Sequence, residues 1–228
     1  MIRRLASFGC SFIWGTELAD HQRHDVLNGY SRLTWPALLA KNLALGYHCL
    51  ARGGSGNLAI ADQVCGWIDK SPHDFVIINW TFLDRFDYSD PQGRHFNSGL
   101  GDYSTCRPGN DDAVSEFYFR HLHSEYRDKL MGLMYIKTVI DYLLEKKTPF
   151  LMTAMDELLW CQQWHATPLI RKLQQDIRPY VHDFEGRNFL DWSRHRGFRV
   201  SGAGHPLEEA HAAAAELMLP VLQQQISI

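Results

Sequence analysis

The chain has 228 residues, of which 45% are hydrophobic and 12% aromatic, enough to bury a core and too apolar for a disordered protein. Its formal net charge of -3 gives no electrostatic sign of a nucleic-acid partner or an anionic membrane. The 5 cysteines are scattered and form no CxxC pair, so we expect no zinc site and a reducing compartment.

The amino terminus superficially resembles a signal peptide, because Arg3 and Arg4 precede apolar residues. However, Ser7, Gly9 and Ser11 interrupt the apolar stretch before it becomes a hydrophobic segment of the required length. No window approaches the ~20 apolar residues that a membrane-spanning helix needs. We therefore expect a soluble, cytoplasmic protein without a membrane partner.

Short apolar runs alternate with helical patterns along the chain. Strands are predicted at 4–9, 47–51, 75–78, 150–153 and, as a short element, 189–191. Helices are predicted at 36–45, 58–70, within 113–147, at 168–181 and at 207–224. This alternation predicts a single α/β domain over 1–228, a three-layer α/β/α sandwich around a mostly parallel sheet.

The polar segment 87–112 interrupts this rhythm and is longer than most connections in a compact domain. It leaves the third predicted strand on the side where parallel sheets bind their ligands. We therefore expect it to be a loop insertion that covers or borders an active site.

Two residues are candidates for nucleophilic chemistry. Ser11 follows the first predicted strand, at the carboxyl edge of the sheet, and Gly9 permits a tight exit from that strand. His205 stands just before a proline that opens the last helix, where a base could reach a strand end. Each residue alone has a simpler interpretation, as a turn or helix-capping serine and as a structural histidine.

Further polar and glycine-rich segments follow the second and third predicted strands. The run Arg52-Gly53-Gly54-Ser55-Gly56-Asn57 opens a helix, but its spacing does not fit a dinucleotide-binding motif. The third strand ends in Asn79-Trp80-Thr81-Phe82-Leu83-Asp84-Arg85, whose polar side chains could face the same crevice. The simpler interpretations are a plain strand-to-helix turn and a surface pair.

Together, the order of these segments resembles the SGNH (GDSL-like) hydrolases. That family has a G-x-S motif after the first strand, matched by Gly9-Cys10-Ser11, and an S-G-[DN] segment, matched by Ser55-Gly56-Asn57. Its D-x-x-H motif before the last helix is matched at His205, but Gly202 stands where the aspartate is expected. The family's G-x-N-D segment reads Asn79-Trp80-Thr81-Phe82 here. The pattern G-C-S-F-x-W-G-x-E looks like a divergent branch.

The resemblance implies a serine esterase that acts on a small O-acyl ester, with acetylated carbohydrate as one class, and that needs no cofactor or metal. Ser11 would be the nucleophile and His205 the base. The backbone amides of Ser11 and Gly56 would hold the oxyanion, with Thr81 or Asn79 replacing the missing asparagine.

The sequence alone does not identify the group that orients His205. A backbone carbonyl near 201–203 is favoured, with the Ser201 hydroxyl and Asp191 as alternatives. The residues expected at the substrate are Trp14, Asn57, Trp80 and Arg85. The missing motif residues also favour a binding or interaction protein with a degraded site, and an O-acyltransferase that uses the same serine is a third alternative. The G-x-S-x-G elbow of α/β-hydrolases is absent, because the residue two positions after Ser11 is Ile13 and not glycine.

Overall fold

The centre of the protein is a four-stranded parallel sheet. The computed structural model describes residues 2–21, 29–89 and 103–226. The strands are β1 (Arg4–Phe8), β2 (Gly46–Cys49), β3 (Phe75–Trp80) and β6 (Phe150–Ala154), in the order β2-β1-β3-β6. All six residues of β3 are buried, as expected for a central strand with helices on both faces. The predicted mostly parallel sheet is confirmed.

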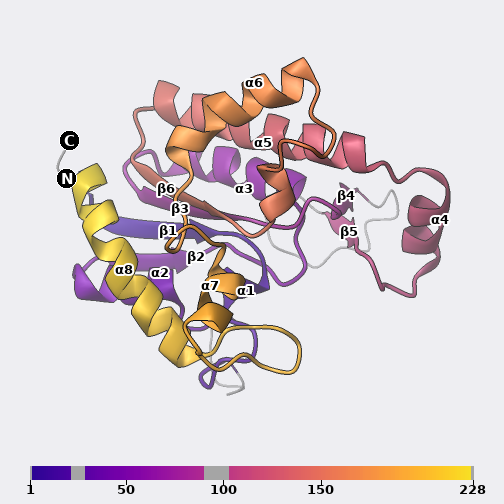
Figure 1. The fold of residues 1–228 in the computed structure, drawn as a ribbon. Coiled ribbons are helices and arrows are strands. Elements are labelled where there is room, and N and C mark those ends of the chain that lie inside the picture. Colours follow the sequence, from indigo (N-terminus) through magenta and orange to yellow (C-terminus); the bar gives the residue numbers. More distant parts are fainter. Residues whose placement is uncertain (1, 22–28, 90–102, 227–228) are drawn as a thin grey trace.

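Helices cover both faces of the sheet, so the predicted three-layer arrangement is also confirmed (Figure 1). One layer contains α1 (Ser11–Trp14), α2 (Trp35–Asn42), α7 (Phe189–His195) and α8 (Glu208–Ile226). The other contains α3 (Asn57–Lys70), α5 (Glu125–Glu145) and α6 (Pro168–Ile177). None of the helices in the described residues has both the length and the apolar character needed to cross a membrane.

The alternation of side chains along β3 separates the two cores. Phe75 and Ile77 pack toward α2 and α8, whereas Val76, Ile78 and Trp80 pack toward α3 and α5. Because the strands are parallel, the segments that follow β1, β2 and β3 all leave from one edge of the sheet. The motif residues of all three segments therefore come together at that edge.

Two parts of the chain differ from the sequence predictions. Residues 189–191 begin helix α7 rather than a strand, because the Asn188 side chain caps a helix by accepting from the Asp191 amide. Beyond β6, the described residues add an isolated parallel bridge between Met152 and Val181 to the sheet, rather than a further strand. The helical region 113–147 is two helices, α4 (Ala113–His121) and α5, because Ser124 caps the second.

The predicted insertion 87–112 contains part of a small antiparallel ribbon. Its strands are β4 (Phe86–Tyr88) and β5 (Ser104–Cys106), and the ribbon lies to the side of the sheet next to α4 (Figure 1). Residues 90–102, between these strands, lie outside the described part of the chain. The assignment of 1–228 as one domain stays a prediction.

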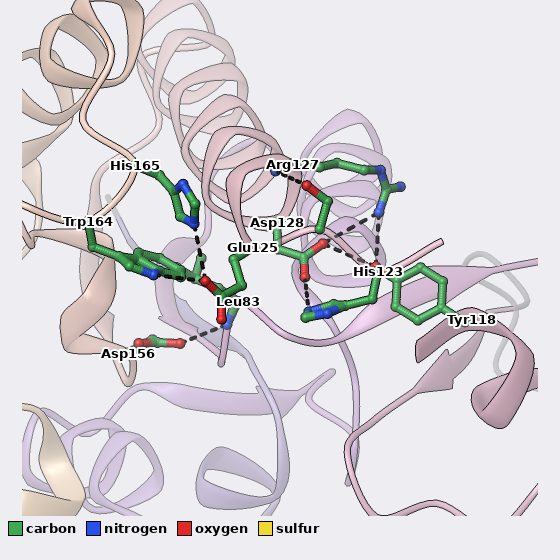
Figure 2. A network of polar contacts seen from close by, with 10 residues as sticks. Leu83, Tyr118, His123, Glu125, Arg127, Asp128, Asp156, Trp164 and His165 are labelled. Carbon is green, nitrogen blue, oxygen red and sulfur yellow. Dashed lines mark hydrogen bonds and ion pairs between the residues drawn. The ribbon is translucent and has the colours of Figure 1, made fainter. Parts of the chain in front are cut away.

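Polar contacts join the loop after β6 to the segment after β3 and to the start of α5 (Figure 2). The Leu83 amide donates to the Asp156 carboxylate at 2.9 Å. At the start of α5, the Glu125 carboxylate accepts from Trp164 Nε1 and contacts His165 Nε2, each at 3.1 Å. The Leu83–Asp156 contact holds the chain as it leaves β3, and the Glu125 contacts hold the loop after β6 against α5.

Candidate active site

The nucleophile candidate, Ser11, lies at the start of a single helical turn directly after β1. Gly9 has a φ of 153°, and a Cβ there would lie 3.0 Å from Asn79 O and 2.9 Å from Ile13 Cγ1, so a side chain would clash. The amides of Ile13 and Trp14 both donate to Cys10 O at 3.0 Å, which starts α1. Ser11 is the first residue of this helix, so its own amide is one of those that have no acceptor within the helix.

Ser11, His205 and Glu17 form a continuous chain of contacts. Ser11 Oγ lies 2.8 Å from His205 Nε2, and Glu17 Oε2 lies 2.6 Å from His205 Nδ1. The Phe12 ring packs against the imidazole, with 5.2 Å between the ring centroids. Ser11 is 9% exposed, so its hydroxyl is held at the surface of the core rather than free in solvent. A serine, an imidazole and a carboxylate in this order form the arrangement of a catalytic triad.

Ser201 holds the carboxylate and the histidine together. Its hydroxyl donates to Glu17 Oε2 at 2.5 Å and accepts from the His205 amide at 3.0 Å. Glu17 itself has a φ of 71°, a strained left-handed conformation for a residue with a side chain. A second tie joins the same two segments, because the Ala19 amide donates to Glu208 Oε1 at 2.8 Å. These contacts explain how the chain maintains the strained conformation.

The charge of Glu17 determines the tautomer of His205. Hydrogen bonds from Ser201 and from His205 hold the pKa of the Glu17 carboxyl below its ordinary value of 4.5. The carboxylate is therefore ionised at neutral pH and can only accept, so the ring proton resides on Nδ1. Nε2 is then the acceptor for the Ser11 hydroxyl, as a general base must be.

Comparisons with known proteins show the fold and leave the sequence family open. No family profile and no curated protein sequence matches the chain. Among solved structures, the psychrotrophic esterase EstA from Pseudoalteromonas sp. matches with a TM-score of 0.56 at 9% identity, over 99% of this chain and 100% of that one. TesA matches with a TM-score of 0.55 at 12% identity, over 98% and 99%. An acetyl xylan esterase from Butyrivibrio proteoclasticus matches with a TM-score of 0.54 at 13% identity, over 99% of this chain and 64% of that one.

The chain has the SGNH hydrolase fold. The resemblance predicted from the motifs is thus confirmed at the level of the fold. Within this SGNH fold the structure brings Ser11 and His205 together, as the motif order predicts. The sequence reasoning did not assign a role to Glu17, although this residue is the last letter of the G-C-S-F-x-W-G-x-E pattern. Its spacing of six residues from Ser11 was the available signal.

The predicted partners of the second ring nitrogen require correction. Asp191 does not contact His205, because its carboxylate accepts from Asn188 Nδ2 at 2.6 Å and lies beside Arg194. A backbone carbonyl near 201–203 does not fill the position either, since His205 Nδ1 faces Glu17. The Ser201 hydroxyl is involved, but it binds the histidine's amide and the carboxylate rather than the ring.

The Gly56 amide is not a free oxyanion donor in this SGNH fold. It donates to Asp87 Oδ1 at 2.9 Å, and the Ala59 amide donates to Asp87 Oδ2 at the same distance. Thr105 Oγ1 also donates to this carboxylate, at 2.6 Å. Asp87 therefore caps the amino terminus of α3 and ties it to the β4–β5 ribbon. A Cβ on Gly56 would lie 2.6 Å from both carboxylate oxygens, which explains the glycine.

Two residues expected at the substrate are structural. Trp80 is 1% exposed and packs in the core between the sheet and α3 and α5, with its indole nitrogen on Met152 Sδ. Both ends of the Asn57 side-chain amide bind the backbone of Thr81, one accepting from its N–H at 2.9 Å and the other donating to its carbonyl at 3.3 Å. Asn57 thus joins the start of α3 to the end of β3 rather than contacting a ligand.

The other expected residues lie around the carboxyl edge. Thr81 is buried, and its hydroxyl has no hydrogen-bond partner within the described part of the chain. Asn79, the other candidate to replace the missing asparagine, donates its side-chain amide to Thr153 Oγ1 at 2.7 Å. Arg85 donates to Ser55 O at 2.9 Å and stacks on the Phe82 ring, which in turn packs against Phe12.

Proposed function

We propose that the protein is a serine acyl hydrolase in which Ser11, His205 and Glu17 act as nucleophile, base and orienting carboxylate. The observation that carries this proposal is the chain of contacts from Ser11 Oγ through both ring nitrogens of His205 to Glu17, at 2.8 and 2.6 Å. Glu17 supplies the carboxylate that Gly202 cannot, which removes one of the two reasons for a degraded site.

The chemistry follows from this geometry. His205 Nε2 takes the proton of Ser11 as Oγ attacks the acyl carbon, and Glu17 stabilises the imidazolium that forms. The imidazolium then protonates the departing alcohol, which leaves an acyl group on Ser11. In the second half, His205 takes a proton from water as the oxygen of that water attacks the acyl carbon. The imidazolium then returns the proton to Ser11 Oγ as the bond between Oγ and the acyl carbon breaks, and the free acid leaves.

The developing oxyanion needs donors at the carboxyl edge. We assign this role to the Ser11 amide, which lies at a helix start, and to the Thr81 hydroxyl. The register pairs Phe8 with Ile78, so Ser11 and Thr81 each stand three residues beyond paired positions on neighbouring strands. The Thr81 hydroxyl is buried without a partner among the described residues, which supports a role that only a bound substrate completes.

The substrate class we propose is an O-acyl ester with a small acyl group. One of the structures with the same fold is an acetyl xylan esterase, which makes an acetylated carbohydrate a reasonable first substrate for this chain.

The test is hydrolysis of p-nitrophenyl acetate by the wild-type protein and by Ser11→Ala. We expect the variant to lose activity by roughly 10³-fold or more while keeping its melting temperature. Ser71→Ala is a matched control, because Ser71 follows the carboxyl end of α3 and, among the described residues, its hydroxyl accepts a hydrogen bond from Arg4 alone. Wild-type activity in Ser11→Ala would overturn the proposal.

A further inference from the structure

A cleft of about 640 Å³ lies between the loop after β2 and the β4–β5 ribbon. The helix residue Trp14 forms one wall, and Tyr88 and Tyr103 from the ribbon contribute to another. Trp14 is fixed in place, since its indole nitrogen donates to His21 Nε2 at 2.9 Å. Aromatic walls of this kind suit the apolar face of a ring or chain.

One lining residue of the cleft, Trp14, belongs to the same helical turn as the proposed nucleophile. Trp14 stands three residues after Ser11 in α1, so the two side chains lie on the same side of that turn. On the side of the cleft formed by the loop after β2, the Arg52 amide donates to Gly9 O at 3.1 Å. This hydrogen bond keeps the loop beside the end of β1. A group bound in the cleft would therefore lie close to an acyl carbon attached to Ser11.

In the described part of the chain, the Arg107 guanidinium, which lines the cleft, forms no ion pair. Arg52 and Arg107 both line the cleft, and the Arg107 guanidinium lies over Gly54, 2.9 Å from the position of a Cβ there. Within the described residues, Arg107 bonds only to the neutral Asn110 side chain, at 3.2 Å. The carboxylate of Asp112 also lines the cleft, but it accepts from two amides at the start of α4.

A buried amide adds an unused polar group to the cleft lining. Gln63 is 3% exposed, and its Oε1 atom has no hydrogen-bond partner among the described residues. A buried polar atom without a partner is destabilising, and a ligand that donates a hydrogen bond to it would remove that cost. A hydroxyl group on the ligand fits this position.

We propose that this cleft binds the alcohol part of the ester and selects alcohols that carry a negatively charged group, such as a carboxylate, beside free hydroxyls. The inference rests on the proposed function. A small acyl group such as acetyl leaves a cleft of this size to the alcohol. Arg107 provides a planar, multiply donating partner for a carboxylate, Gln63 accepts from a hydroxyl, and Trp14 packs against the carbon skeleton.

The test compares two acetyl esters that differ by one charge, 4-acetoxybenzoate and its methyl ester. We expect Arg107→Gln to lower kcat/KM for the acid by about tenfold or more and to leave the methyl ester within twofold, while Arg107→Lys restores part of the loss. Arg171→Gln is the matched control, because Arg171 is an exposed residue of α6, in the layer on the α3 and α5 side of the sheet. It removes the same charge elsewhere.

A binding measurement separates this inference from the proposed function. Calorimetry with Ser11→Ala should show that 4-hydroxybenzoate binds about tenfold more tightly than methyl 4-hydroxybenzoate, with the difference lost in Ser11→Ala/Arg107→Gln. Equal binding of the two alcohols would overturn the inference even if both esters are hydrolysed. Selective binding without hydrolysis of either ester would support the cleft and contradict the esterase.

Discussion

Replacing Glu17 with glutamine removes the negative charge beside His205 and keeps the length of the side chain. In the wild-type protein two donors, Ser201 Oγ–H and His205 Nδ1–H, converge on the single atom Oε2. The glutamine oxygen can accept from both, so the ring proton stays on Nδ1 in Glu17→Gln. What the variant loses is the charge that stabilises the imidazolium in the transition state.

The expected loss follows from the exposure of this carboxylate. Replacing a triad carboxylate with its amide costs about 10⁴-fold in rate where the amide also imposes the wrong histidine tautomer, so this value is an upper bound for Glu17→Gln, which keeps the tautomer. The Glu17 side chain is 33% exposed, so water takes over part of the stabilisation. We therefore expect Glu17→Gln to lower kcat for p-nitrophenyl acetate by about 10²- to 10³-fold, which corresponds to roughly 3–4 kcal/mol. KM should change little, since the carboxylate does not contact the substrate.

Glu208→Gln is the control for this measurement. Glu208 joins the same two segments through the Ala19 amide and has no contact with the imidazole. We expect its kcat to stay within about threefold of the wild-type value. If Glu17→Gln also stays within threefold, the reasoning is wrong and His205 works without its carboxylate.

The same variant has a pH signature in stability. The folded pKa of Glu17 lies below its ordinary value of 4.5, so its ionised form contributes stability above that pH, and the contribution is lost as pH falls through the folded pKa. We expect the difference in melting temperature between wild type and Glu17→Gln to be full at pH 5–7 and to shrink toward pH 3, as scanned by thermal unfolding. A difference that grows on acidification would contradict this assignment.

Three further predictions concern residues around the triad. Asp191→Asn should keep kcat within about threefold of the wild-type value, because Asp191 does not contact His205. Gly202→Asp should not raise kcat, because Glu17 already occupies the position beside His205 Nδ1. A large effect in either variant would restore the sequence-based assignment. Burial lowers the pKa of His211 to about 3, and its Nδ1 accepts from the Trp35 amide at 3.1 Å. Unfolding therefore takes up a proton between about pH 6.5 and 3, so stability should fall on acidification by up to roughly 1.4 kcal/mol per pH unit, with a smaller slope in His211→Asn. An unchanged slope in denaturant titrations would refute this. Gly56→Ala should lower the melting temperature as well as kcat, since its Cβ displaces Asp87, and a loss of kcat alone would return Gly56 to the oxyanion donors.

The sequence predicted the sheet and the two partners of the central contact, because these depend on local patterns. Continuous apolar runs such as the one at residues 75–78 identify buried strands, and the carboxyl ends of parallel strands must share an edge. The G-x-S motif and the histidine before the last helix were therefore sufficient to pair Ser11 with His205.

The carboxylate was not predictable in the same way, since its position depends on a left-handed residue after a one-turn helix. Glu17 reaches His205 because Gly15 ends α1 and Glu17 itself adopts a φ of 71°. The periodicity of apolar residues along the sequence does not indicate such a turn. The Asp87–Gly56 contact was equally hidden, because it links a strand outside the main sheet to the start of α3 across 31 positions in the chain. Long-range pairing of this kind leaves no mark in a single sequence.

The short apolar run at Phe189 shows a third limit. The apolar pair Phe189-Leu190, followed by Asp191 and Trp192, fits a short strand and one face of a helix equally well. The Asn188 cap, which accepts from the Asp191 amide, decides for the helix, and capping residues also occur in ordinary turns.

The nucleophile can be tested most directly by covalent labelling. An organophosphonate inhibits EstA, which has the same fold, and a fluorophosphonate probe reports an activated serine without knowledge of the natural ester. After reaction at neutral pH and digestion, mass spectrometry should find the phosphonyl group on Ser11, with labelling slowed by roughly 10²-fold or more in His205→Ala. Labelling at another serine, or equal labelling with and without His205, would contradict the account.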